Sequence, residues 1–228
     1  MGVTGAERWL SALWPVVRER LPDPPARVVE VGCGTLGGFV PALRAAGYDA
    51  VGVDPKAPPG PHYCSIGIEE FGPTGDVDAV VASTSLHHVA DPQQVIAKLA
   101  SALGPGGIAV VIEWAWDDLD EQTVLWGLDR LGSAERPGWL HRRRQEWTAS
   151  GLPWERFLRE WAEREHIHRA ATLVQLLDER FERVHLGRGP YLFADLREAS
   201  EEDEVEAIAA GEIRATRLEY VGRARPRL

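Results

Sequence analysis

The chain has 228 residues, of which 44% are hydrophobic and 26% charged, which is enough for one soluble domain with a sizeable core. Its formal net charge of −10 argues against a nucleic-acid partner, because phosphate binding depends on clusters of lysine and arginine. With two cysteines and no long apolar run, the sequence offers no disulfide framework, no four-ligand zinc site and no membrane span. We therefore expect one domain over residues 1–228 that works in the cytoplasm without a metal.

The N-terminal half predicts an amphipathic helix followed by alternating strands and helices. The helix covers residues 6–20 and ends before the prolines that follow Leu21. Asp91 is expected to cap one of the later helices. Short apolar runs predict strands at 27–31, 49–53, 62–65, 77–83 and 108–113, with helices at 39–46 and 92–103. This alternation indicates crossover connections and a mostly parallel, doubly wound α/β sheet.

The segment 114–171 breaks this alternation. It is helical in pattern and holds seven of the nine tryptophans. We interpret it as a helical cap inserted after the fifth strand, although most tryptophans in such a segment serve only to pack it onto the sheet. Sheet character returns at 181–186 and, after an acidic helix at 201–210, in a last run at 213–221.

A glycine-rich turn is the most informative motif. Residues 28–38, VVEVGCGTLGG, place Gly32, Gly34 and Gly37 between a strand and a helix, where the backbone can approach a polar or anionic ligand. Asp54 follows Gly34 by 20 residues, at the end of the next strand, where a carboxylate can bind both hydroxyls of a ribose. The spacing fits a dinucleotide as well as S-adenosylmethionine (SAM), since both contain ribose.

Three further features favour SAM. They are the start of the turn, E-V-G-C-G-T from Glu30, the stretch DAVVASTSLHHV at 78–89, and LGPGG at 103–107. With these motifs in this order, the chain resembles the class I SAM-dependent methyltransferases, in particular their UbiE-like small-molecule branch. The resemblance implies a Rossmann-like sheet of about seven strands with an antiparallel C-terminal strand.

The resemblance also implies roles for individual residues in SAM binding. Asp54 takes the ribose, and Glu30 organises the turn near the methionine amino group. The chain departs from the family at Gly67-Ile68-Glu69, where an acidic residue followed by a small one is common, so the Ile68 backbone amide is an alternative adenine contact. The implied cofactor-binding residues are Glu30, Gly32, Cys33 and Gly34 at the methionine end, Asp54 at the ribose, Ile68 and Glu69 at adenine, and Ser83 beside the methionine moiety.

Histidines are the candidates for acid–base catalysis. His87 and His88 follow the predicted fourth strand, and a neutral imidazole there can take a proton from an attacking hydroxyl or amine. His168 lies where the cap rejoins the core and is a third candidate. The alternative for all three is a structural role. The basic run 141–144 is interpreted as a solvated helical face rather than an anion site.

The predicted function is methyl transfer from SAM to a small-molecule acceptor by direct displacement. Ligands in open α/β folds bind beyond the carboxyl ends of the strands, so the cap is expected to close over that edge and to supply most acceptor contacts. One alternative is a non-catalytic SAM-binding module. Another is an NAD(P)-dependent oxidoreductase, which is disfavoured because neither lysine lies four residues after a tyrosine.

Overall fold

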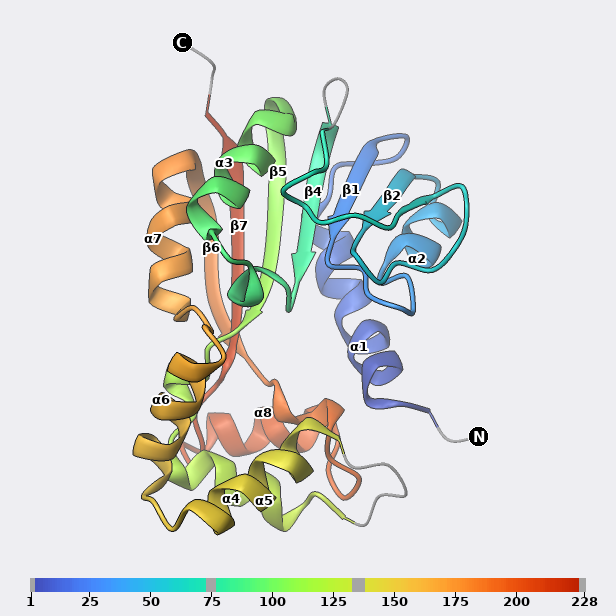
Figure 1. Cartoon of the computed structure of the whole chain (residues 1–228). Helices are drawn as coiled ribbons and strands as arrows, with labels where there is room; N and C mark the ends of the chain where they lie inside the picture. The colour runs from blue at the N-terminus through green and yellow to red at the C-terminus, as the bar shows by residue number, and fades with distance from the viewer. Residues whose placement is uncertain (1–2, 73–76, 133–137, 226–228) are drawn as a thin grey trace.

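The computed structural model describes residues 3–72, 77–132 and 138–225. Its centre is one seven-stranded sheet in the order β3-β2-β1-β4-β5-β7-β6, in which β7 alone runs antiparallel to its neighbours (Figure 1). The predicted mostly parallel sheet with an antiparallel C-terminal strand is therefore confirmed. The strands are β1 (Arg27–Val31), β2 (Asp49–Val53), β3 (Tyr63–Cys64), β4 (Val77–Ser83), β5 (Leu103–Trp114), β6 (Phe181–Gly189) and β7 (Arg217–Ala224).

Helices cover both faces of the sheet, which explains why its central strands are apolar along almost their whole length. On one face, α1 (Gly5–Arg20) and α2 (Val40–Ala45) pack against β1, β2 and β4. On the other, α3 (Pro92–Ala102) and α7 (Ala170–Arg180) form a second core with β4 and β5. The Asp91 carboxylate accepts a hydrogen bond from the Gln94 amide at 2.9 Å and so begins α3 as predicted.

Helix α1 begins with a capping box in which Thr4 and Glu7 bond each other's backbone amides. Trp9, Leu13 and Val17 repeat every four residues along it, and all three are buried. The helix therefore presents one apolar stripe to the sheet, and Trp9 stands nearest the carboxyl ends of the strands, where its indole nitrogen bonds the Ser83 hydroxyl at 3.1 Å.

The helices between β5 and α7 gather beyond the carboxyl end of β5 (Figure 1). They are α4 (Glu121–Asp129), α5 (Trp139–Ser150) and α6 (Trp154–Arg164), and residues 133–137 of the same segment lie outside the described residues. Helix α8 (Glu201–Ala209) joins them, so that one hydrophobic core holds residues of both segments. We call α4, α5, α6 and α8 the helical cap.

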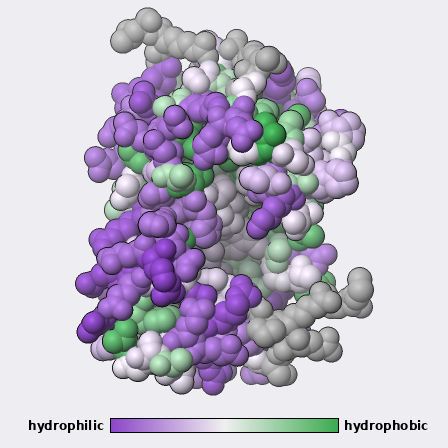
Figure 2. All heavy atoms as spheres, in the orientation of Figure 1, coloured by the Kyte–Doolittle hydropathy of each residue, from purple (hydrophilic) through white to green (hydrophobic). Residues whose placement is uncertain are grey.

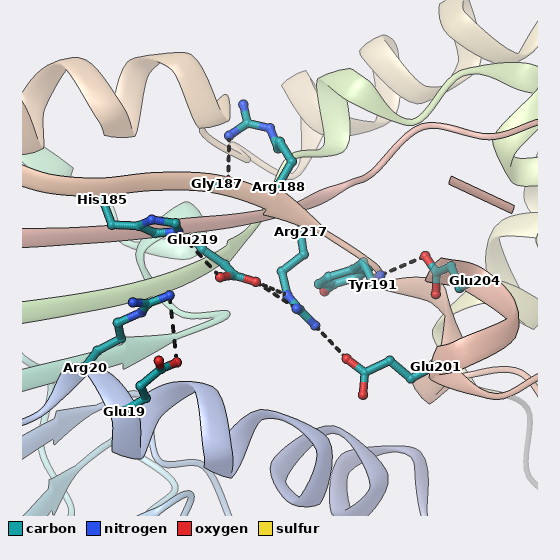
Figure 3. Close-up of polar contacts among 10 residues, drawn as sticks. All are labelled: Glu19, Arg20, His185, Gly187, Arg188, Tyr191, Glu201, Glu204, Arg217 and Glu219. Atoms are coloured by element: carbon teal, nitrogen blue, oxygen red, sulfur yellow. Dashed lines mark hydrogen bonds and ion pairs between the residues drawn. The ribbon is translucent and has the colours of Figure 1, made fainter. Parts of the chain in front are cut away.

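Arg217, the first residue of β7, ties the cap to the sheet (Figure 3). Its guanidinium lies 2.7 Å from the Glu219 carboxylate on its own strand and 3.2 Å from Glu201 at the start of α8. Glu204 then accepts hydrogen bonds from three successive backbone amides, those of Tyr191, Leu192 and Phe193. Together these contacts fix α8 against the end of β6.

The last strand begins later than the sequence predicts, at Arg217 instead of residue 213. Ile213 is buried in the hydrophobic core of the cap, to which Ala207 of α8 also belongs. The apolar residue that suggested the strand start therefore serves the cap. Among the described residues, no helix combines the length and apolarity needed to cross a membrane.

Candidate functional site

The glycine turn between β1 and α2 has a backbone that only glycine adopts easily. Gly32 has φ of +78°, and a methyl group added there would lie 2.3 Å from the Ser85 Cβ. Its amide donates to the Val53 carbonyl at 2.8 Å, which closes the turn against the end of β2. The turn is thus held between the ends of β2 and β4, at the carboxyl edge of the sheet.

Glu30 lies buried beneath this turn. Its carboxylate accepts a hydrogen bond from the Phe39 amide at 2.7 Å, and a methyl group on Gly38 would lie 2.1 Å from the same carboxylate. Burial raises the pKa of Glu30 to about 8, and the hydrogen bonds from Phe39 and Val40 only partly oppose this effect. Glu30 therefore fixes the shape of the turn from below.

Asp54 follows β2 and faces the same turn. One carboxylate oxygen accepts from the Gly34 amide at 3.1 Å, and the other accepts from the Lys56 amide at 2.6 Å. These two bonds orient the carboxylate across the mouth of the turn. A ligand hydroxyl placed there would find an acceptor whose direction is already set.

Two adjoining cavities open at this edge, and both are lined by Gly32 and Thr84. The larger has a volume of about 530 Å³ and the smaller about 210 Å³. Figure 2 shows that this face of the molecule is hollowed between the sheet and the cap. Of the predicted residues, Asp54, Ile68, Glu69 and His88 line the larger cavity, whereas Glu30, Cys33, Gly34 and Ser83 line the smaller one.

The predicted residues contribute to these walls in different ways. The Cys33 thiol is turned toward Gly52, where an added methyl group would lie 2.9 Å from it, and burial raises the pKa of Cys33 to about 12. Cys33 thus stays protonated and is unsuited to act as a nucleophile. The Ser83 hydroxyl accepts a hydrogen bond from the Trp9 indole, and both residues line the smaller cavity.

The three candidate histidines converge on the loop after β4. His87 is buried and its Nδ1 bonds the carboxylate of Glu113, near the end of β5. The ring of His88 lies 4.1 Å from that of His87, and burial, helped by His87, lowers the pKa of His88 to about 4. His168 holds the loop from the other side, because its amide donates to the His87 carbonyl at 3.0 Å and its Nε2 lies 2.8 Å from the Val89 carbonyl oxygen.

Two buried charged residues, one at the loop after β4 and one in the cap, were not predicted. Glu113 interrupts an otherwise apolar run, and this isolated carboxylate was the one available signal for it. Arg143 belongs to the run interpreted as a solvated face, yet it is buried, with its guanidinium 4.6 Å from the centre of the Trp161 ring. That interpretation is wrong for Arg143, because α6 covers this side of α5.

The raised pKa of Glu30 predicts a characteristic dependence of stability on pH. Between the ordinary value of 4.5 and about 8, the folded protein keeps a proton that the unfolded chain releases, so stability falls as pH rises. The expected loss from Glu30 over this interval is on the order of 5 kcal/mol, at about 1.4 kcal/mol per pKa unit. Glu30→Gln removes the charge but keeps an oxygen for the Phe39 amide, and its stability should change less with pH.

Urea unfolding at about pH 5 and about pH 8 measures how much the free energy of unfolding of each protein changes with pH. Glu204, whose pKa burial also raises, is present in both proteins and supplies an equal background. The same loss of stability in wild type and Glu30→Gln would show that Glu30 ionises freely in the folded state.

Comparisons with known proteins agree with the fold and the motifs. Residues 6–181 match a family model described as a methyltransferase domain. The chain is 28% identical over 140 residues to a ubiquinone biosynthesis O-methyltransferase of Bradyrhizobium sp. (strain ORS 278), covering 56% of this chain and 53% of that protein. It is 34% identical over 119 residues to a tRNA U34 carboxymethyltransferase of Tolumonas auensis, covering 45% and 36%. The chain thus spans about half or less of the length of these relatives.

A solved structure extends the likeness of the fold to nearly the whole chain. The N-methyltransferase NodS of Bradyrhizobium japonicum WM9, in complex with S-adenosyl-l-homocysteine, superposes with a TM-score of 0.56 at 16% identity, covering 98% of this chain and 89% of that one. At this identity the likeness concerns the fold alone. The family model matches most of the chain and includes the glycine turn, Asp54 and the loop after β4. The chain therefore belongs to the class I SAM-dependent methyltransferases, whose cofactor is SAM.

Proposed function

We propose that this protein transfers the methyl group of SAM to a small-molecule acceptor by direct displacement. The observation that carries the proposal is the pair of adjoining cavities at the carboxyl edge of the sheet, with Glu30 at one and Asp54 at the other. SAM has a zwitterionic amino acid end, a cationic sulfonium at its middle and a neutral nucleoside end. Two polar anchors separated by a glycine turn fit the two ends of such an elongated ligand.

The anchors fit the chemical groups of SAM one by one. The ribose hydroxyls would donate to Asp54, and adenine would lie in the larger cavity beside Ile68 and Glu69. The methionine end would occupy the smaller cavity, against the backbone of Gly32 to Gly34 and beside Ser83. The methyl group would then stand near Gly32 and Thr84, where the two cavities adjoin.

The acceptor would approach from the cap. Aromatic rings from four parts of the chain pack on one another, and one of them, Trp9, lines the smaller cavity. Trp9 lies 5.0 Å from Tyr191, and Trp114 lies 5.8 Å from Tyr191 and 4.6 Å from Trp139. Aromatic walls suit a small, partly apolar acceptor better than a nucleic acid backbone, and the net charge of −10 points the same way.

Alignment of the acceptor with the methyl group would supply most of the catalysis. Holding two reactants in attack geometry can contribute roughly 7–11 kcal/mol to lowering a barrier. The chain's part is to fix the donor through the glycine turn and to enclose the acceptor beneath the cap. Exclusion of water from this space would also prevent unproductive collisions of the sulfonium with solvent.

The test combines a binding and a transfer measurement. Calorimetry is expected to show micromolar binding of S-adenosylhomocysteine and none of NADH. SAM labelled in its methyl group is then incubated with the protein and separate fractions of a cell extract, one of small molecules and one of total tRNA. Label in the small-molecule fraction supports the proposal. Label only in tRNA would show that the acceptor is a tRNA and not a small molecule. Cofactor binding without any transfer would favour a non-catalytic SAM-binding module.

A further inference from the structure

Trp9 forms part of the wall of the smaller cavity. It lines that cavity together with Ala6 and Leu10, which lie on the same side of α1. The residue is only 8% exposed, so the cavity is the main space open to its ring. A cavity of about 210 Å³ is narrow, and a ligand group that fills it touches the walls on all sides. The methionine end of SAM would therefore be in contact with the indole.

Contacts with three residues fix the orientation of the indole. Its nitrogen donates to the Ser83 hydroxyl at 3.1 Å. The ring of Phe193 is nearly parallel to it, at 19° with centroids 5.9 Å apart, and the ring of Tyr191 meets it at 68° and 5.0 Å. Both rings come from one short turn, residues 191–194, and reach the indole from the same side. The opposite face of the indole is left toward the cavity.

The bond to Ser83 also brings the indole close to the place of the sulfonium. Ser83 immediately precedes Thr84, and Thr84 lines both cavities where they adjoin. Successive residues are about 3.8 Å apart, so the indole lies within about one residue of this junction. A cation within about 6 Å of the centre of a tryptophan ring, over its face, is attracted by the π electrons, and more strongly where water is excluded.

The other groups at the two cavities meet parts of the ligand that SAM and S-adenosylhomocysteine share. Asp54 would bind the ribose, which is the same in both. Glu30 lies beneath the turn at the methionine end, and burial, which raises its pKa to about 8, keeps it largely protonated at neutral pH. The two ligands differ at sulfur, which carries a methyl group and a positive charge only in SAM. Trp9 is thus placed to respond to that difference.

We propose that Trp9 distinguishes SAM from its product by a cation–π contact between the indole face and the sulfonium. The inference rests on the proposed function, because it needs SAM to occupy both cavities. In the transfer, the bond between sulfur and the methyl carbon breaks, its electron pair stays on sulfur, and the sulfur becomes neutral. The attraction to the indole then ends while the shared contacts remain. Trp9 therefore favours the exchange of S-adenosylhomocysteine for a new SAM.

Calorimetry with SAM and with S-adenosylhomocysteine, in the absence of an acceptor, measures this discrimination. Trp9→Leu removes the ring, whereas Trp9→Phe keeps a ring with weaker attraction for cations, and both lose the bond to Ser83. The Kd for S-adenosylhomocysteine divided by the Kd for SAM should fall by about 5- to 30-fold in Trp9→Leu and by less in Trp9→Phe. A distortion of the cavity that weakens both ligands alike cancels in this ratio. An unchanged ratio in both variants would overturn the proposal.

Trp154→Phe is the matched control. Trp154 is also a buried tryptophan whose nitrogen donates to an oxygen, the Leu119 carbonyl at 2.7 Å, but it lines neither of the two cavities. This substitution should leave the ratio of the two dissociation constants unchanged. A fall as large as that in Trp9→Phe would show that the ratio responds to loosening of the fold, and would contradict the role of Trp9.

SAM labelled with carbon-13 in its methyl group provides a measurement on the wild type. The ring current of an indole shifts protons over its face upfield and protons at its edge downfield. We expect the methyl protons of bound SAM to move upfield from their position in free SAM, and this shift should disappear in Trp9→Leu. A downfield shift, or none, would overturn the proposal even if the Trp9 variants fail to fold. If the wild type binds neither ligand, the proposed function itself is wrong.

Discussion

Asp54→Ala is expected to weaken S-adenosylhomocysteine binding by about 10- to 150-fold, which corresponds to about 1.5–3 kcal/mol for the loss of hydrogen bonds to a charged group. In the structure its two oxygens also accept from the amides of Gly34 and Lys56. The substitution therefore removes the hydrogen-bond acceptor for the ribose and also the two hydrogen bonds that hold the glycine turn and Lys56 in place. Titration calorimetry measures the binding constant, and a thermal melt reports on the fold.

Asp54→Asn is the matched control for this experiment. It keeps one oxygen for the Gly34 amide but loses the charge and the second acceptor, so we expect a loss intermediate between those of wild type and alanine. If Asp54→Ala binds S-adenosylhomocysteine as tightly as wild type, Asp54 is no part of the cofactor site.

Gly32→Ala is expected to lower stability by roughly 2–5 kcal/mol. A left-handed backbone costs a residue with a side chain about 1–2 kcal/mol. The new methyl group would in addition stand 2.3 Å from the Ser85 Cβ, and relieving such an overlap in a packed site costs about 1–3 kcal/mol more. For a chain of this size the melting temperature should fall by about 5–15 °C.

Gly34→Ala separates the two contributions. Gly34 has a similar φ of +60°, but no atom lies within 4 Å of an added methyl group. Only the backbone cost remains, so its melting temperature should fall by about 2–6 °C. Equal shifts for the two variants, measured by circular dichroism without ligand, would mean that Ser85 moves away at no cost.

The sheet was predictable because its signals are local. Apolar runs such as residues 77–83 coincide with β4, and the Asp91 cap marks the start of α3 within one residue. The antiparallel C-terminal strand followed from the family resemblance. The order of the strands was not predicted, since periodicity carries no information on which strands pair. Where periodicity alone was used, as for the run from residue 213, the strand began four residues later because the cap competes for Ile213.

The candidate site was predictable where a motif lies in one short stretch. The glycine turn and Asp54 fall into this class. The hydrogen bond between His87 and Glu113 could not be predicted in this way, because the two residues are 26 positions apart and meet only when β4 and β5 pair. The burial of Arg143 escaped prediction for the same reason, since it depends on α6 packing across α5, which no pattern within the run 141–144 records.

The hydrophobic core of the cap is drawn from two distant stretches of chain, one between β5 and α7 and the other between β6 and β7. The match to the family model ends at residue 181, before the second stretch begins. The cap therefore cannot be exchanged as one continuous segment of the chain. A chimera that exchanges residues 114–171 alone would set foreign tryptophans against native Leu192, Leu196 and Ala207, and both stretches must be exchanged together. Mutations in one stretch therefore constrain those that the shared core accepts in the other.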